Sequence, residues 1–360
     1  MTFRHLSIDY LLGMGVWLAV GVVALVVLLK LRRRWKSRPK LRWLAHAGLS
    51  MWMLLFLLTL VELYFATVYD RSDSFNMTNV SKKWFSLHVE PDQKLLTFSD
   101  GRGLKYRDDR EFPRSVPNDK RHICFLGDSF TFGHGVPDVR DRFSNRVRAE
   151  LESKSPGRFV VSNLADAGTD LFWVEAVLKK LFAEGPRIDT VVYVMCLNDI
   201  ETFAPDPNAF YTDLGDLSPR FFLFRDTYFL NFIYFRYKQY TRPAVKSYYS
   251  FVREFYDGRP WERMRRKLLA VREMCRRKGT DFRVVVFPFL HNLGPDYEFR
   301  PVHGKVVSFC KSHEIPVLDL DPLLTPHVDD GLTVNRFDAH PNERAHELAA
   351  EAILGQMTKE

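Results

Sequence analysis

The sequence of 360 residues predicts an α/β domain with a parallel five-stranded sheet, preceded by a two-helix transmembrane hairpin. From residue 121 onward, short apolar segments of strand length alternate with longer amphipathic segments of helix length. This alternation is typical of a parallel sheet that is covered by helices on both faces. Before residue 70, two apolar runs flank a short basic segment. A hydrophobic content of 46% and a charged content of 27% are typical of an ordered protein.

The N-terminal segment, residues 1–69, is expected to cross a membrane twice. The first apolar run, about residues 10–29, has no charge and is long enough for the ~30 Å hydrocarbon core of a bilayer. The second, about residues 44–66, is interrupted only by His46 and Glu62. A signal peptide is disfavoured because the positive charges follow the first run instead of preceding it. The other interpretation, two buried helices of a soluble protein, is disfavoured by the length of the runs.

The segment between the two runs, residues 30–43, determines the expected orientation. It contains eight Lys and Arg residues and no acidic residue. Short basic loops stay on the cytoplasmic side, so residues from about 69 onward should lie outside the cytoplasm. Much of the net charge of +8 lies in this segment, so the charge does not indicate a nucleic-acid partner. The lipid bilayer, crossed by both helices, is the first expected partner.

The rest of the chain divides into a connector and a main domain. Residues 70–120 are polar and rich in turn residues, and we expect a juxtamembrane connector that packs on the main domain, residues 121–360. The expected strands are 122–126, 159–164, 190–197, 282–289 and 316–320, and the expected helices are 141–153, 171–183, 261–277, 299–313 and 342–356. An aromatic-rich insertion spans about residues 201–260. Its aromatic residues favour a helical subdomain with its own core, and a sugar-stacking cleft or a surface resting on the bilayer are the alternatives.

Residues whose groups could take part in a reaction follow several of the expected strands. In a parallel sheet, ligands bind beyond the carboxyl ends of the strands. The residues expected at that edge are Ser129, within a Gly-Asp-Ser turn, Gly168, Asn198, Asp338 and His340. Taken alone, the Gly-Asp-Ser turn is explained equally well as an ordinary strand end. The presence of all five residues at one edge favours a nucleophile at Ser129.

In this order, these motifs resemble those of the SGNH (GDSL-type) hydrolase superfamily over about residues 121–358. Block I is similar to residues 125–133 (Phe-Leu-Gly-Asp-Ser-Phe-Thr-Phe-Gly), and block V to residues 338–342 (Asp-Ala-His-Pro-Asn). The glycine of block II matches Gly168, and the asparagine of block III matches Asn198. The resemblance implies a three-layer, flavodoxin-like α/β fold and a serine ester hydrolase or O-acyltransferase that uses no cofactor.

The resemblance also implies a role for each residue. Ser129 would be the nucleophile, His340 the general base, and Asp338 the residue that orients the imidazole. The backbone N–H groups of Ser129 and Gly168 and the side-chain amide of Asn198 would form the oxyanion hole. Two further carboxylates would support the site, Asp128, which is expected to brace the turn, and Asp199.

Two departures from the family pattern affect these assignments. The orienting Asp usually stands three residues before the His, a position that Phe337 holds here, so either Asp338 or a backbone carbonyl could orient His340. The glycine that usually begins block III is Cys196. We expect Cys196 and Cys124 to be small core residues and not disulfide partners, because both lie in expected buried strands, and the cysteine spacings fit no zinc site. No histidine has metal-ligand spacing, so no metal is predicted, and only His134 is expected to line the pocket.

The expected function is an extracytoplasmic esterase or acyltransferase acting on O-acyl groups, in the first place O-acetyl, of an envelope or exported glycan. A weaker resemblance, carried by residues 103–113, is to alginate O-acetyltransferase-type SGNH domains of membrane-anchored bacterial proteins. It implies a location in the bacterial inner (cytoplasmic) membrane, with the catalytic domain on the periplasmic side, and a possible acyl-transferring membrane enzyme as partner. The alternatives are a lipase or lysophospholipase acting on lipid esters, and a structural scaffold subunit of an envelope complex.

Overall fold

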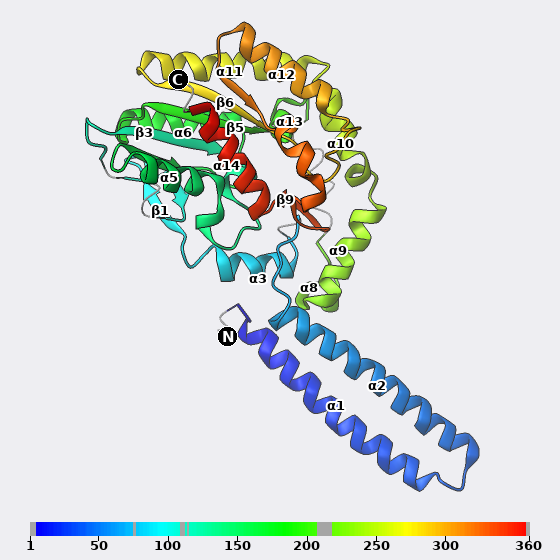
Figure 1. The fold of residues 1–360 in the computed structure, drawn as a ribbon. Helices are drawn as coiled ribbons and strands as arrows, with labels where there is room; N and C mark the ends of the chain where they lie inside the picture. Colours follow the sequence, from blue (N-terminus) through cyan, green and yellow to red (C-terminus); the bar gives the residue numbers. More distant parts are fainter. Residues whose placement is uncertain (1–4, 75–76, 109–111, 114, 207–217, 358–360) are drawn as a thin grey trace. The chain divides into compact units, whose positions relative to one another are not determined.

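A computed structural model describes residues 5–74, 77–108, 112–113, 115–206 and 218–357 (Figure 1). The chain forms two compact units. The helical unit comprises Met1–Arg71, Phe75–Leu87 and Asp216–Thr241, and the sheet unit comprises Ser72–Ser74, His88–Gly215 and Arg242–Glu360. Parts of the connector and of the insertion therefore group with the N-terminal helices, which is a different division from the expected domain boundaries.

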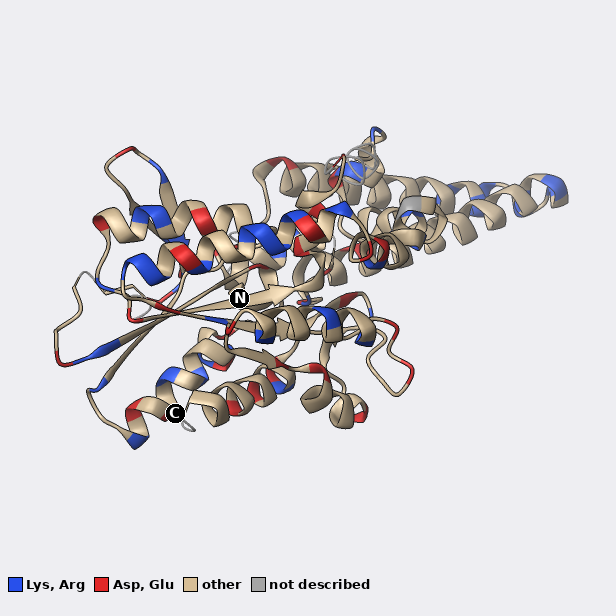
Figure 2. Cartoon of the chain, turned by 90° about the horizontal axis from the view of Figure 1, so that it is seen from above, with Lys and Arg blue, Asp and Glu red and all other residues tan. Residues whose placement is uncertain are grey.

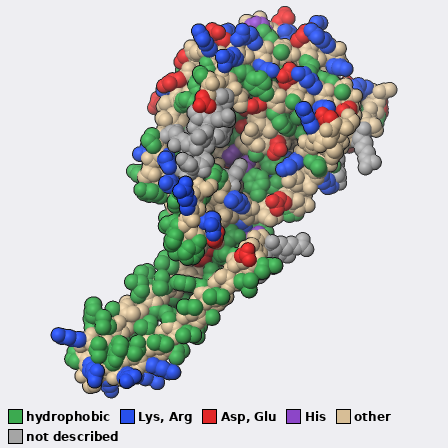
Figure 3. Space-filling model, turned by 180° about the vertical axis from the view of Figure 1, so that it is seen from behind, with side chains coloured by type: hydrophobic (Ala, Val, Ile, Leu, Met, Phe, Trp, Pro, Cys, Tyr) green, Lys and Arg blue, Asp and Glu red, His purple; other side chains and the backbone are tan. Residues whose placement is uncertain are grey.

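The helical unit is built on two long helices, α1 (Ile8–Arg34) and α2 (Pro39–Thr67). The Ser7 side chain caps the start of α1 by accepting a hydrogen bond from the Tyr10 N–H, and Pro39 occupies the first turn of α2, where its missing N–H costs nothing. Both expected apolar runs lie within these longer helices, and both helices are long and apolar enough to cross a membrane. Apolar side chains cover much of the hairpin on the face seen in Figure 3, and Lys and Arg gather at its connecting end (Figures 2 and 3).

Polar side chains join the two long helices at several levels. The Tyr10 hydroxyl donates to Glu62 (3.0 Å), and the Trp17 indole donates to Thr59 (2.9 Å). Partly buried hydrogen bonds of this kind hold apolar helices in one register, because an unpaired partner would lose hydrogen-bond energy.

Glu62, which interrupts the second apolar run, caps another helix of the same unit. Its carboxylate accepts hydrogen bonds from the backbone N–H groups of Tyr228 (2.8 Å) and Phe229 (2.7 Å). These N–H groups lie at the start of α9 (Phe229–Thr241), where the first N–H groups have no partner within the helix. The insertion is thereby tied to the last turns of α2. It also contributes α8 (Phe222–Asp226).

The connector contributes α3 (Asn79–His88), a helix that the sequence analysis did not anticipate. The Lys83 ammonium donates to the backbone carbonyls of Phe65 (2.6 Å) and Tyr69, at the carboxyl end of α2. A cation at this position satisfies carbonyls that a helix end leaves free.

The sheet unit contains the expected parallel five-stranded sheet, which confirms the predicted fold class. Its order is β4-β3-β5-β6-β7, with all four neighbouring pairs parallel. The strands are β3 (Arg121–Gly127), β4 (Phe159–Asn163), β5 (Thr190–Cys196), β6 (Asp281–Phe287) and β7 (Val317–Asp319). Every residue of the central strand β5 is buried, as a strand covered on both faces requires.

Helices cover both faces of this sheet, giving three layers (Figure 2). The helices are α5 (Phe143–Lys154), α6 (Leu171–Glu184), α11 (Arg259–Arg277), α12 (Arg300–Ser312) and α14 (Glu343–Met357). The α5 crossover leads outward from β3 to β4, whereas α6, α11 and α12 lead in the opposite direction. Right-handed crossovers of opposite direction lie on opposite faces. Helix α14 packs on α5, and α6 packs on α11.

Further elements belong to the sheet unit. They are β1 (Lys94–Thr97), β2 (Gly103–Tyr106), α4 (Ser129–Phe132), η2 (Val139–Asp141), η3 (Leu197–Phe203), α10 (Pro243–Phe255), α13 (Asp321–Leu324), η4 (Thr325–Asp330), β8 (Thr333–Asn335) and β9 (Asp338–Pro341). The antiparallel hairpins β1–β2 and β8–β9 were not expected from the sequence. All four cysteines are buried and free, which confirms Cys124 and Cys196 as core residues.

Candidate active site

The serine turn is formed by a close approach of backbone at the end of β3. A Cβ atom on Gly127 would lie 2.5 Å from the Val194 carbonyl oxygen and 2.4 Å from Thr131 Oγ1, so only glycine fits. The next residue, Asp128, accepts a hydrogen bond from the Phe130 N–H (2.9 Å) and caps α4. Ser129 is consequently held as the first residue of α4, at the carboxyl edge of the sheet.

The structure brings the three expected triad residues together. His340 Nε2 lies 2.9 Å from Ser129 Oγ, and His340 Nδ1 lies 2.5 Å from Asp338 Oδ1. Asp338 and His340 both belong to β9, and side chains two residues apart on an extended strand point to the same face. This geometry explains how a spacing one residue shorter than the usual family spacing still places the carboxylate on the imidazole.

Asp338 has two further partners, neither of which the sequence analysis assigned to it. The Ser72 hydroxyl donates to Asp338 Oδ2 (2.5 Å), and His134 Nε2 lies 3.4 Å from the same oxygen. The His134 ring also packs on the His340 ring, with 4.2 Å between centroids. Ser72 is 266 residues from Asp338 in the chain, within a connector whose sequence gave no signal for it. His134 was expected only to line the pocket.

The ionisation of these groups follows from their contacts. Burial disfavours charge on Asp338, but the positive charge of His340 and hydrogen bonds from both histidines outweigh it and lower the pKa of Asp338 well below its usual range. Burial lowers the pKa of His340, but the charge of Asp338 and its hydrogen bond outweigh that effect and raise this pKa. Burial, together with the charge of His340, lowers the pKa of His134. His340 is therefore the stronger base of the two imidazoles.

The same residues contain a possible metal-ligand set. Donor atoms of His134, Asp338 and His340 lie within 4.8 Å of one another. His134 lies far along the chain from Asp338 and His340 of β9, so sequence spacing could not reveal the cluster. Since the two ring nitrogens of His340 already connect Ser129 to Asp338, the arrangement is suited to moving a proton from the hydroxyl to the imidazole.

The expected oxyanion-hole residues lie at the same sheet edge. The Thr169 hydroxyl donates to the Gly127 carbonyl (2.9 Å), which holds the loop of Gly168 beside the end of β3. Gly168 has φ +74°, and a Cβ placed on it would have no atom within 4 Å. Asn198 lies in the first turn of η3, directly after β5, whose Val194 pairs with Gly127.

The two supporting carboxylates lie beneath this edge. Burial raises the pKa of Asp128 to about 6. Burial and the charge of Asp128 raise the pKa of Asp199 well above its usual value. Asp199 accepts a hydrogen bond from the Tyr193 hydroxyl (2.5 Å), and Asp128 is hydrogen-bonded by the Cys196 thiol. Cys196, which replaces the usual glycine, thus contributes to the support of the serine turn.

Because Asn198 is the expected side-chain donor to the oxyanion, replacing it with Ala should lower kcat for ester cleavage by about 10²–10³-fold. KM should change little, since this donor acts mainly on the transition state. Steady-state hydrolysis of p-nitrophenyl acetate measures both constants. A KM increase at unchanged kcat would place Asn198 in ground-state binding instead.

Comparison with known proteins finds distantly similar solved structures. No family model matches the sequence, and no curated protein matches it. Similar solved structures include a lipolytic protein of the G-D-S-L family from Veillonella parvula, at 16% identity and a TM-score of 0.40, covering 67% of this chain and 100% of that chain. An acetyl xylan esterase from Geobacillus stearothermophilus is 14% identical with a TM-score of 0.42, covering 66% and 94%. A two-domain esterase active on acetylated mannans is 18% identical with a TM-score of 0.38, covering 70% and 51%.

The strand order of the sheet and the sites of the motif residues agree with the fold expected from the sequence. Ser129 follows the first strand of the parallel sheet, Gly168 the second and Asn198 the third, and His340 precedes the last helix. These positions are the ones that the resemblance of the motifs to SGNH (GDSL-type) hydrolases implies.

Proposed function

We propose that this protein is an esterase or acyltransferase that acts on O-acyl groups, in the first place O-acetyl, of an envelope or exported glycan. The observation that carries the proposal is the hydrogen-bonded series from Ser129 through His340 to Asp338. A hydroxyl, a base of raised pKa and a buried carboxylate in this order are the groups that acyl transfer through a serine requires.

The first half of the reaction forms an acyl-enzyme. Ser129 Oγ attacks the acyl carbon while its proton passes to His340 Nε2, and the tetrahedral oxyanion accepts hydrogen bonds from the donors at Ser129, Gly168 and Asn198. Collapse of this intermediate breaks the bond between the acyl carbon and the sugar oxygen. The imidazolium of His340, stabilised by Asp338, gives its proton to that leaving oxygen.

The second half regenerates the serine. A water or a sugar hydroxyl loses its proton to His340 and attacks the acyl carbon, and Ser129 Oγ leaves and regains a proton. Water gives net hydrolysis, whereas a sugar hydroxyl gives acyl transfer. Both outcomes use the same residues of this chain, so the acceptor decides between the two activities.

The location that we propose is the outer side of the cytoplasmic membrane, with α1 and α2 as the anchor. Large apolar side chains are exposed along both helices, and eight basic residues lie within 30–43 at the connecting end. In the same helical unit, Tyr237 and Tyr240 of α9 and Phe221 and Phe222 near α8 are also exposed. Tyr and other amphipathic rings favour the headgroup region, which supports bilayer contact beside the carboxyl end of α2.

Purified full-length protein in detergent should release acetate from chemically acetylated polysaccharide and cleave p-nitrophenyl acetate faster than p-nitrophenyl palmitate. The expected preference follows from a glycan substrate with a small acyl group. Enzymatic acetate determination and p-nitrophenol absorbance measure the two reactions. Faster cleavage of the palmitate ester would favour the lipase alternative. A further assay uses polysaccharide that carries isotopically labelled acetyl groups. Transfer of labelled acetyl to an added oligosaccharide, without release of free acetate, would identify an acyltransferase.

Alkaline phosphatase fused after residue 71 should be active in a bacterial host, because this enzyme folds only outside the cytoplasm and the basic segment stays inside. The matched fusion after Ser37, between α1 and α2, should be inactive. Phosphatase activity normalised to fusion-protein abundance measures the difference. The reverse pattern would overturn the proposed orientation.

A further inference from the structure

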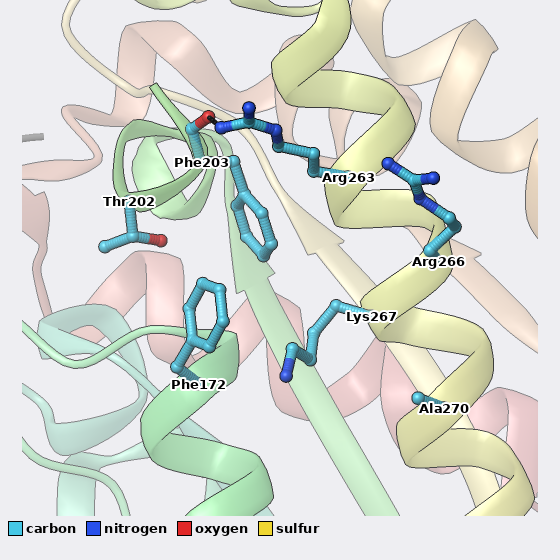
Figure 4. A pocket seen from close by; sticks show the side chains of 7 residues that line it. All are labelled: Phe172, Thr202, Phe203, Arg263, Arg266, Lys267 and Ala270. Atoms are coloured by element: carbon cyan, nitrogen blue, oxygen red, sulfur yellow. Dashed lines mark hydrogen bonds between the residues drawn. The ribbon is translucent and has the colours of Figure 1, made fainter. Parts of the chain in front are cut away.

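A cavity of about 360 Å³ opens between α6, η3 and α11 of the sheet unit (Figure 4). Its lining includes Phe172, Thr202, Phe203, Arg263, Arg266 and Lys267. None of these residues has a part in the acyl-transfer steps, and the sequence analysis singled out none of them. Aromatic faces and cationic groups are combined in this one cavity.

The aromatic part is a stacked pair. The rings of Phe172 and Phe203 lie 4.8 Å apart with 29° between their planes. Phe203 is 3% exposed and acts as the fixed base, whereas Phe172 is 45% exposed. Figure 4 shows both rings facing the cavity between the two helices. A rigid apolar ring that remains half exposed can pack against the apolar C–H face of a sugar at little entropic cost.

The cationic part contains positive charge that acidic side chains do not neutralise. The Lys267 ammonium lies 4.4 Å from the centre of the Phe172 ring and 2.7 Å from a Glu175 carboxylate oxygen. Among the residues that the structure describes, no carboxylate lies within 4 Å of Arg263 or Arg266. Arg263 donates to the backbone carbonyl of Phe203 (3.5 Å).

Two unneutralised guanidinium groups three residues apart on one helix repel each other. Farther along α11, Arg276 and Arg277 instead both bind Glu273, at 2.7 Å and 2.9 Å. The charge at the cavity is therefore a local feature of the first half of α11. A bound anion would relieve the repulsion, and a planar carboxylate matches the fork of a guanidinium.

The cavity lies close to the expected oxyanion hole along two separate chain segments. Phe172 is four residues after Gly168, and Thr202 is four residues after Asn198. Four residues span at most about 14 Å even when fully extended. In the 3₁₀ helix η3 the corresponding rise is about 8 Å. Neighbouring units of one polysaccharide chain could therefore occupy the cavity and reach Ser129.

We propose that this cavity binds a carboxylate-bearing sugar unit of the glycan substrate, next to the unit that carries the ester. The inference rests on the proposed function and specifies its substrate class as an acidic polysaccharide. The Phe172 ring would contact the sugar face, and Arg263 and Arg266 would bind the carboxylate. The cavity then determines specificity through binding, without contacting the reacting ester.

The test compares two double variants of equal charge change on the same helix. R263Q/R266Q removes the two cavity charges, and R276Q/R277Q removes two charges that are paired outside it. Substrates are chemically acetylated polygalacturonate, chemically acetylated mannan and p-nitrophenyl acetate. For R263Q/R266Q we expect KM for acetylated polygalacturonate to rise about tenfold or more, with its kcat and both other substrates unaffected. R276Q/R277Q should leave all three substrates unaffected.

An equal rise in KM for R276Q/R277Q would overturn the proposal, because it would show a general charge effect. If R263Q/R266Q raised KM for acetylated mannan as much as KM for acetylated polygalacturonate, the proposal would also be overturned. Inorganic phosphate and oligogalacturonate are also compared as competitive inhibitors of acetylated polygalacturonate cleavage. Inhibition by phosphate alone would overturn the carboxylate assignment.

Failure of the proposed function can be distinguished from failure of this inference. If wild-type protein cleaves no ester, binding of fluorescent oligogalacturonate is measured on wild type and on both double variants. Binding that R263Q/R266Q alone weakens by about tenfold or more would support the cavity assignment without any activity. Equal binding by all three proteins, or no binding by wild type, would overturn it.

Discussion

Replacing Ser129 with Ala should abolish cleavage of p-nitrophenyl acetate, with a loss in kcat on the order of 10⁴–10⁶. The variant lacks the proposed attacking atom, the hydroxyl oxygen that lies 2.9 Å from His340 Nε2. It should also lose covalent labelling by a fluorophosphonate probe, which reacts with an activated serine. Gel fluorescence after labelling and initial rates of p-nitrophenol release measure the two effects.

Ser250 offers a matched control, because it is an exposed serine of α10. Ser250→Ala should label and turn over like wild type, and circular dichroism should give the same spectrum for all three proteins. Labelling of Ser129→Ala at the wild-type level, or no labelling of wild type, would remove the enzyme assignment. The scaffold alternative would then account for the fold.

The strands of the sheet unit were predictable because they are short runs of apolar residues that follow turn residues. Central strand β5, with seven buried residues, is the clearest case. The approximate place of Ser129, Gly168 and Asn198 was also predictable, since parallel strands bring their carboxyl ends to one edge. The hairpin β8–β9 was not, because its two short strands have partly buried side chains and little apolar pattern. That hairpin carries Asp338 and His340.

Contacts between distant segments were the part that the sequence could not reveal. Ser72 reaches Asp338 from a connector without periodicity, and Glu62 interrupts an apolar run without indicating that it caps α9. Arg263 and Arg266 looked like any exposed residues of an amphipathic helix. Their significance depends on Phe172, which a different helix contributes. In each case, a local pattern has no information about the partner that gives the residue its role.

Replacing Asp338 with Asn should lower kcat/KM for p-nitrophenyl acetate by about 10³–10⁴-fold. The amide keeps the shape of the side chain but removes the negative charge that stabilises the His340 imidazolium in the transition state. Its NH2 group can also donate a hydrogen bond to Nδ1 and so hold the imidazole in the wrong tautomer. Asp319→Asn is the matched control, because Asp319 forms a partly buried His–Asp contact outside the site, with His303 (2.6 Å). That variant should retain wild-type kcat/KM.

The direction of the pH dependence provides an independent readout. A general base must be neutral, so kcat/KM rises with pH through the pKa of His340. The charge and hydrogen bond of Asp338 raise that pKa, so the acid limb of wild type should have its midpoint above the usual value of about 6.5. Asp338→Asn removes both contributions and should move the acid limb to lower pH, whereas Asp319→Asn should leave it in place.

His340→Ala decides between the triad and a dyad that is oriented by a backbone carbonyl. The Nδ1–Oδ1 distance of 2.5 Å predicts that Asp338→Ala and His340→Ala lose comparable activity. A loss for Asp338→Ala that is far smaller than for His340→Ala, with an unmoved acid limb, would contradict the triad. Ser72→Ala should fall between wild type and Asp338→Ala, because it removes one hydrogen bond from Asp338 Oδ2 but leaves the charge. Asp338→Asn tests the charge of the carboxylate, and Ser72→Ala tests a contact that holds its position. Asp338→Ala and His340→Ala give the full loss with which both are compared.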